Sequence, residues 1–158
     1  MAALLAGGAM AEVSEPPTPG FYLRTRPHGF VVHLVASGDN LRAVRELTRK
    51  TLASEGVDTE TAESAQLVLS ELVGNSVRAC GEWVPLVVEL SVGRTVVVLG
   101  VHDPDPARIP RRRAVAMDDA DAESGRGLAL VDLLTSGWRV ARSPVGKQVR
   151  CRLELAAG

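Results

Sequence analysis

The sequence predicts an α+β fold, a two-layer sandwich in which helices cover one face of a mixed, mostly antiparallel sheet. Two observations support this prediction. Apolar residues recur with helical spacing in two stretches, 41–52 and 62–80, and a shorter helical stretch follows residue 127. Short runs rich in Val and Leu occur as adjacent pairs around glycine or proline, which is typical of antiparallel hairpins.

Length and composition favour one globular domain. The chain has 158 residues, and its 46% of apolar residues is enough to build a core. The net charge of -1 gives no reason to expect direct binding to nucleic acid or to an anionic membrane. No apolar run reaches the roughly 18 residues that a membrane span needs. Two cysteines, Cys80 and Cys151, are too few for a disulfide framework, so we expect reduced thiols and a cytoplasmic protein.

The first half of the chain predicts a tail, a strand and two helices. Residues 1–28 are expected to be a flexible N-terminal tail, and residues 29–156 to form the domain. A strand over 30–36 is followed by a helix that Ser37, Asp39 or Asn40 caps and Gly56 ends. Asp58 or Thr59 then caps the helix that runs to Cys80.

The second half predicts two strand pairs separated by a loop and a helix. The runs at 85–92 and 95–103 form a hairpin around Gly93 and Arg94. A long charged segment follows, and a segment of this length with little periodicity is usually functional or disordered. Ser124 and the three residues after it open a helix over 128–134. Two final strands, 138–141 and 149–155, meet around Pro144 and Gly146.

The long helix carries the first candidate site residues. Glu71 and Asn75 are four residues apart, so their side chains lie one above the other on a single helix face. An amide oxygen can ligate a hard cation such as magnesium, and a carboxylate can orient or deprotonate a hydroxyl group. The alternative for such a pair is an ordinary solvated helix face.

Three further places could contact a phosphate or a base. Asp103 ends an apolar strand and could accept a hydrogen bond from an amine; the alternative is a carboxylate that caps a turn. Gly125 and Gly127 stand before a helix, where free N–H groups bind anions; the alternative is a flexible loop. Gly146 precedes the last strand, but Gln148 stands where a Walker A loop needs Ser or Thr.

The order of these features resembles the GHKL (Bergerat-fold) ATP-binding domain. Within that family the chain is most similar to the small anti-sigma-factor serine/threonine kinases of the bacterial sporulation and stress type. The likeness covers roughly residues 30–155, and four stretches carry it: ELVGNSVRAC, VVVLGVHDPDPARIP, ESGRGLALVDLLTSGWRV and GKQVRCRLEL.

The resemblance implies a role for each candidate residue. Asn75 matches the residue that holds the Mg²⁺ bridging the ATP phosphates, and Glu71 matches the carboxylate proposed to activate the attacking hydroxyl. Asp103 matches the aspartate that reads the adenine amino group. The segment 104–124 would be the ATP lid. The remaining nucleotide-binding positions are Gly125, Arg126, Gly127 and Leu128 at the end of the lid and Gly146 near the adenine pocket.

The resemblance also implies a function. The chain would be an ATP-binding anti-sigma factor that binds a sigma factor and phosphorylates a serine of an anti-anti-sigma (STAS-type) protein, acting as a homodimer. The family's D-x-G-x-G motif is replaced here by Asp103-Pro-Asp-Pro-Ala, which lacks both glycines. This departure favours a second hypothesis, a catalytically inactive module of the same fold that regulates transcription by holding a partner. A third hypothesis is an α+β interaction domain unrelated to nucleotides.

Overall fold

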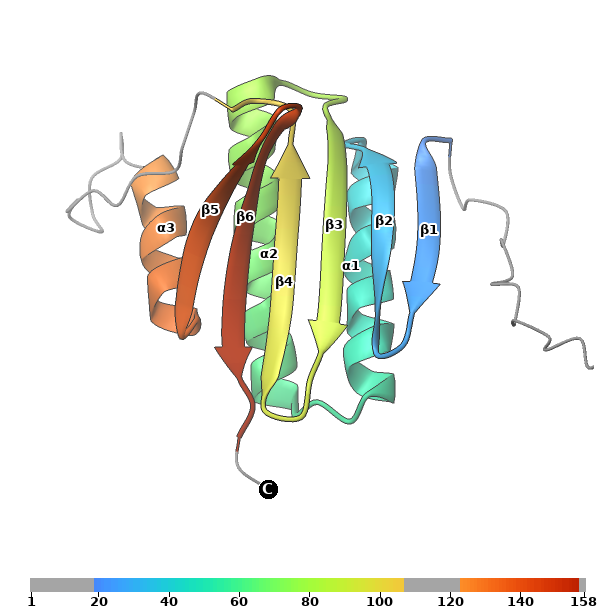
Figure 1. Ribbon diagram of the computed structural model, residues 1–158, viewed down its shortest axis with the longest axis vertical. Helices are drawn as coiled ribbons and strands as arrows, with labels where there is room; N and C mark the ends of the chain where they lie inside the picture. Colours follow the sequence, from blue (N-terminus) through green and yellow to red (C-terminus); the bar gives the residue numbers. More distant parts are fainter. Residues whose placement is uncertain (1–18, 107–122, 157–158) are drawn as a thin grey trace, which may run out of the picture.

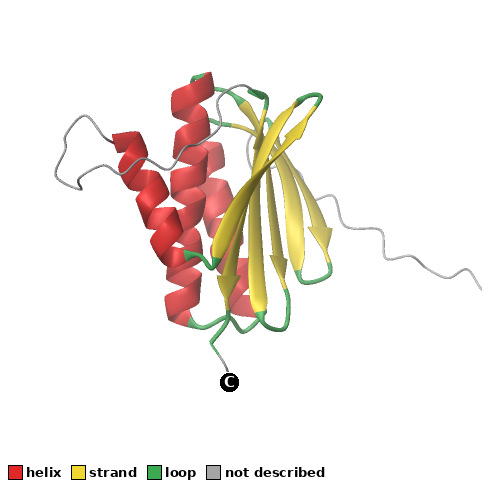
Figure 2. Cartoon of the chain, turned by 60° about the vertical axis from the view of Figure 1, so that its left-hand side comes forward, coloured by secondary structure: helices red, strands yellow, loops and turns green. Residues whose placement is uncertain are grey.

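The fold is a six-stranded antiparallel sheet with three helices packed on one of its faces. The computed structural model describes residues 19–106 and 123–156. The strand order across the sheet is β1-β2-β3-β4-β6-β5 (Figure 1). Seen from the side, the helices form one layer and the sheet the other (Figure 2). The elements in chain order are β1 Phe21–Arg26, β2 Gly29–Val35, α1 Gly38–Ser54, α2 Thr59–Cys80, β3 Pro85–Val92, β4 Val96–Asp103, α3 Glu123–Leu134, β5 Gly137–Ser143 and β6 Gly146–Glu154.

This architecture confirms the predicted α+β sandwich. Every neighbouring strand pair is antiparallel, and three of the pairs are hairpins between strands adjacent in the chain: β1–β2, β3–β4 and β5–β6. Alternate strand residues face the helices, as the two-residue period of a strand requires. The core between the layers is aliphatic with few aromatics, and its largest fully buried side chains are Phe30, Leu52, Leu69, Leu86 and Leu99.

Local signals set the bounds of the first two helices. The Ser37 hydroxyl accepts a hydrogen bond from the Asn40 N–H and so caps α1. The Asp58 carboxylate accepts from the Thr61 N–H and caps α2. α2 ends where Gly81 takes a positive φ of 93°. Among the helices that the structure describes, none is long and apolar enough to cross a membrane.

The N-terminal boundary differs from the expectation of a flexible tail through residue 28. Residues 21–26 form β1, which pairs with the whole of β2 at one edge of the sheet. Phe21 explains the attachment, because its side chain is only 3% exposed and packs in the core. Residues 1–18 of the expected tail lie outside the described residues, as do residues 157–158.

The third helix begins earlier than predicted. α3 runs from Glu123 to Leu134, so the expectation of a helix that begins at Leu128 is wrong. Gly125 and Gly127 are predicted to stand before the helix, but a glycine inside a helix weakens it by only about 1 kcal/mol relative to alanine. In this helix both glycines are accommodated within the first turns.

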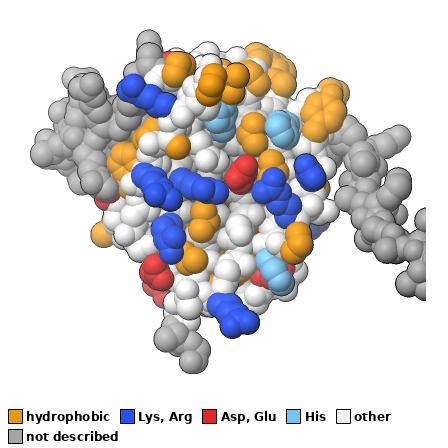
Figure 3. Space-filling view, viewed as in Figure 1, with side chains coloured by type: hydrophobic (Ala, Val, Ile, Leu, Met, Phe, Trp, Pro, Cys, Tyr) orange, Lys and Arg blue, Asp and Glu red, His pale blue; other side chains and the backbone are white. Residues whose placement is uncertain are grey.

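The sheet face away from the helices is open and rich in arginine. Alternation along the strands places Arg24 of β1, Arg139 of β5 and both Arg150 and Arg152 of β6 on it. Blue side chains accordingly form a band across the surface in Figure 3. Glu89 lies on the same face, 3.8 Å from the Arg150 guanidinium. The basic character of this face contrasts with the overall net charge of -1.

Candidate functional site

Two residues predicted from the long helix lie where α2 faces the end of β4. Glu71 and Asn75 are both half-buried and one helical turn apart. The Asn75 Oδ1 accepts a hydrogen bond of 2.5 Å from the Arg78 Nη2. The Asn75 Nδ2 is buried and has no hydrogen-bond partner in the described part of the chain. A buried, unpaired amide donor is rare in folded proteins and needs an explanation, which an oxygen atom of a bound phosphate would supply.

Asp103 lies at the end of β4 and contacts α2 through Ser76. Its side chain is 4% exposed, and its Oδ2 accepts a hydrogen bond of 2.7 Å from the Ser76 hydroxyl. Because Ser76 follows Asn75 in the chain, this bond holds Asp103 next to the candidate phosphate-binding end of α2. The structure therefore holds Asp103 against α2 at Ser76, the residue that follows Asn75.

The carboxylate of Asp103 is also the centre of a buried ion pair. Lys147 Nζ lies 2.9 Å from Asp103 Oδ1, and both side chains are almost completely buried. The same ammonium group donates a hydrogen bond of 2.8 Å to the Asp105 carbonyl. The Asp105 N–H donates a bond of 3.0 Å to Asp103 Oδ1. Lys147 thus binds the start of β6 to the end of β4 and to the backbone of Asp105, which follows β4.

Gly146 makes this close approach possible. Its φ of 145° lies in the region that favours glycine, and a Cβ atom there would lie 1.9 Å from the Asp103 carbonyl oxygen. The predicted glycine near the adenine pocket is therefore packed against the backbone of the predicted adenine-reading aspartate.

The remaining predicted positions are only partly described. Gly125, Arg126, Gly127 and Leu128 lie in the first turns of α3, and their side chains fall outside the described residues. Most of the expected lid, residues 107–122, also falls outside them. How these positions lie relative to Asn75 and Asp103 therefore stays a prediction.

Sequence reasoning missed Lys147 as a partner of Asp103. The sequence predicts Gly146 near the adenine pocket but assigns no role to Lys147, because no basic residue is adjacent to Asp103 in the sequence. The partner stands 44 residues away. The signal that could have found it is strand register, since Asp103 and Lys147 lie opposite each other in the β4–β6 ladder.

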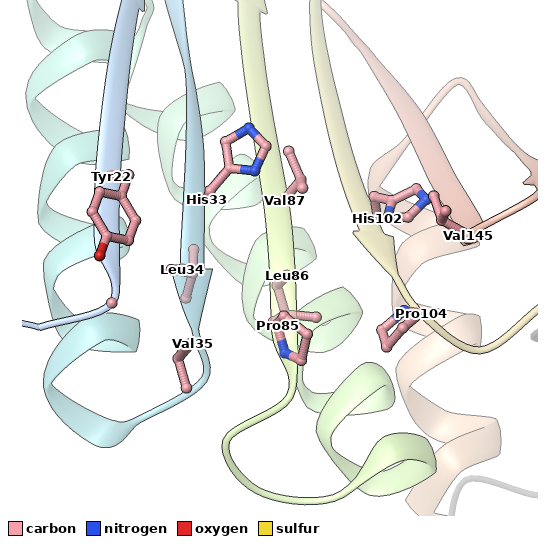
Figure 4. Close-up of a pocket in the computed structure, with 11 residues that line it drawn as sticks. Tyr22, His33, Leu34, Val35, Pro85, Leu86, Val87, His102, Pro104 and Val145 are labelled. Atoms are coloured by element: carbon pink, nitrogen blue, oxygen red, sulfur yellow. The ribbon is translucent and has the colours of Figure 1, made fainter.

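A separate hollow lies on the open face of the sheet, on the side away from α2. It has a volume of about 350 Å³ and lies across the starts of β1 and β3 and the ends of β2 and β4 (Figure 4). Its walls are mainly apolar, with two histidines. They include Tyr22, His33, Val87, His102, Pro104 and Val145. Pro104 and Val145 border the Asp103 and Lys147 segments, so only the sheet itself separates this hollow from the buried ion pair.

The architecture is an α+β sandwich: a six-stranded antiparallel sheet with three helices on one face. The model of the histidine kinase-like ATPase domain family matches residues 34–153 of the chain. The chain therefore belongs to the histidine kinase-like ATPase domain family. No curated protein matches the chain. The family assignment shows that the likeness of the motifs is not accidental.

The described residues suit the phosphate end of a magnesium-nucleotide better than they suit its base end. Asn75 offers an unpaired buried donor and an amide oxygen, which suits phosphate oxygens and a hard cation. A cation on that oxygen would have to displace the Arg78 guanidinium, because two positive groups at one oxygen repel each other. Asp103, in contrast, already accepts three hydrogen bonds.

Proposed function

We propose that this protein is an ATP-dependent regulator of transcription. In this proposal it acts as an anti-sigma factor that holds a sigma factor and transfers phosphate to a serine of a STAS-type anti-anti-sigma protein. The supporting observation is the buried Asn75 Nδ2, which has no hydrogen-bond partner among the described residues. It lies one turn from the Glu71 carboxylate, and the residue after Asn75 makes the Ser76–Asp103 hydrogen bond. A half-buried carboxylate and an unsatisfied amide on one helix face suit positioning and charge stabilisation in phosphoryl transfer.

Three residues would each have a separate role in the reaction. Asn75 would hold Mg²⁺ and the phosphate oxygens, and its amide group would gain the partner that it now lacks. Glu71 would orient the serine hydroxyl of the partner and accept its proton. Asp103 would face the base. When bound, magnesium-ATP supplies the phosphoryl group and part of the charge neutralisation.

The test of nucleotide binding is thermal unfolding of the full chain with and without millimolar magnesium-ATP. Ligand binding raises the melting temperature by mass action, so we expect a clear rise for the natural sequence. Asn75→Ala should abolish the rise. A natural chain that shows no rise would contradict the proposal.

The test of phosphoryl transfer uses labelled ATP and candidate STAS-type proteins. Glu71→Ala should keep the thermal shift and lose the label on the partner, because its carboxylate acts on the hydroxyl and not on the nucleotide. Glu63→Ala is the matched control, since Glu63 is an exposed carboxylate on the same helix. Transfer that survives in Glu71→Ala would remove Glu71 from the mechanism.

One observation favours the second function, a partner-binding module without catalysis. Asp105 and Ala107 stand where the family's motif has glycines, and prolines occupy the positions before each of them. Lys147 also donates a hydrogen bond to the Asp105 carbonyl and so holds this backbone in place. In that case a sigma factor binds the chain equally well with and without ATP, and no label reaches any partner. Homodimerisation, which we also propose, is tested separately by light scattering of the purified chain.

A further inference from the structure

The buried pair of Lys147 and Asp103 gives the base end of the candidate site a chemistry different from that of a lone carboxylate. The two side chains are 3% and 4% exposed, and their charged atoms are 2.9 Å apart. Each charge therefore compensates the other in a region from which solvent is excluded. A group that approaches Asp103 meets a neutral pair and not a net negative charge.

A count of donors and acceptors shows what the pair still offers. A carboxylate has about four acceptor positions. The Lys147 ammonium and the Asp105 N–H occupy Oδ1, and the Ser76 hydroxyl occupies one position on Oδ2. The ammonium has three N–H donors, of which two are used among the described residues. Within residues 19–106 and 123–156, one acceptor position on Asp103 and one N–H of Lys147 are therefore not used, and the two side chains are paired with each other.

The pair is held from several sides, so it will not open easily. Lys147 is bound to both the side chain of Asp103 and the carbonyl of Asp105. Prolines at 104 and 106 fix φ on either side of Asp105. If Lys147 moved away, the Asp103 carboxylate would stay buried without a compensating charge, which is strongly unfavourable.

We propose that, because of Lys147, the site does not require the 6-amino group of adenine. Purine nucleotides with an amino or a carbonyl group at C6 then bind with similar affinity. An amino group donates to the remaining acceptor of Asp103, and a carbonyl group accepts from the remaining donor of Lys147. A lone carboxylate, in contrast, attracts the amino group and repels the carbonyl oxygen. The inference rests on the proposed nucleotide binding and names which nucleotides the same site takes.

The experiment compares ATP with inosine triphosphate, which has a carbonyl group at C6 and an N1–H donor where ATP has an amino group and a bare N1 acceptor. Dissociation constants are measured by calorimetry with magnesium on the full chain. For the natural sequence we expect the two constants to agree within about threefold. Lys147→Gln removes the charge and keeps an N–H donor, and it should favour ATP by about tenfold, the difference between a neutral and a charge-assisted hydrogen bond.

Lys50→Gln is the matched control, because Lys50 is the only other lysine of the chain and lies on the exposed side of α1. The ratio of the two constants should not change in this variant. A natural chain that prefers ATP by tenfold or more would overturn the inference while leaving the proposed function intact. An unchanged ratio in a folded Lys147→Gln variant would also overturn it.

A second measurement needs no variant. The chain is treated with an amine-acetylating reagent, and the peptides that contain Lys50 and Lys147 are quantified by mass spectrometry. Lys147 should stay protected in the presence of either nucleotide while Lys50 reacts. Acetylation of Lys147 that appears with ATP alone would mean that adenine breaks the pair, against the inference. If neither nucleotide binds the natural chain or any variant, the proposed function fails and the inference falls with it.

Discussion

Gly146 illustrates how one residue can control the geometry of the candidate site. It lies between Val145, which borders the open-face hollow, and Lys147, which pairs with Asp103. The strand start can approach the Asp103 carbonyl so closely only because no side chain intervenes. Packing and backbone conformation both require glycine at this position.

Gly146→Ala should therefore destabilise the fold by about 3 kcal/mol, because a Cβ atom would collide with backbone that cannot move aside as a flexible side chain could. Denaturant unfolding of the variant measures the loss. Gly38→Ala is the control: a Cβ atom there meets nothing within 4 Å, and the first turn of α1 tolerates alanine. Equal stability of the two variants would contradict the packing argument.

For single residues, the sequence indicated which polar side chains could form the candidate site, but it did not indicate which side chains they would contact. Glu71 and Asn75 were placed on one helix face by a spacing of four, which depends only on helix geometry. The partner of Asp103 depends on which strand lies beside β4 and in which register, and no local rule gives either. For this reason Lys147 was found only in the folded chain.

Elements with local start and stop signals were predicted well, and elements without them were not. The caps of α1 and α2 are short-range contacts within three residues, so their positions follow from the sequence. β1 alternates apolar side chains with polar and charged ones at the edge of the sheet, a pattern that edge strands use and that resembles a polar tail. α3 begins through glycines that normally indicate a loop.

The cap of α2 should make the stability of that helix depend on pH. Hydrogen bonds from the backbone and side chain of Thr61 hold the pKa of Asp58 below its usual value of 3.8. A lowered folded-state pKa adds stability above the unfolded value, and that stability is lost as the pH falls through the folded value. Asp58→Ala should thus melt roughly 2 to 4 °C lower than the natural chain at pH 7.

Below pH 3.8 this difference in melting temperature should shrink. Asp58→Asn separates charge from hydrogen bonding, because an amide oxygen still caps the helix but does not titrate near this pH. It should melt close to the natural chain at low pH. A gap between Asp58→Ala and the natural chain that is the same at both pH values would show that the carboxylate charge has no part in the cap.

For the molecule as a whole, the layers were predictable and the strand order was not. Alternating apolar residues and amphipathic helices specify a sheet with one covered face. The insertion of β6 between β4 and β5 pairs β6 with a strand far from it in the sequence, and sequence periodicity does not encode that pairing. The base end of the candidate site lies at this β4–β6 junction, so its chemistry is a property of the assembled sheet.

The extent of the folded unit can be tested by truncation. A chain that begins at residue 29 loses β1 and the buried Phe21 side chain, and β2 becomes an exposed edge. We expect it to melt roughly 5 to 10 °C below a chain that begins at residue 19. Scanning calorimetry of the two chains measures the difference. Equal melting temperatures would mean that β1 adds nothing to the fold.

The arginines gathered on the open sheet face have a consequence for how the molecule behaves at charged surfaces. Arg139, Arg150 and Arg152 line one shallow depression there. A local cluster of like charge interacts with a surface within about one Debye length, roughly 10 Å at 0.1 M salt, whatever the sum over the whole chain. Near neutral pH the protein should adhere by this side to a cation-exchange resin, despite its formal charge of -1, and elute in moderate salt.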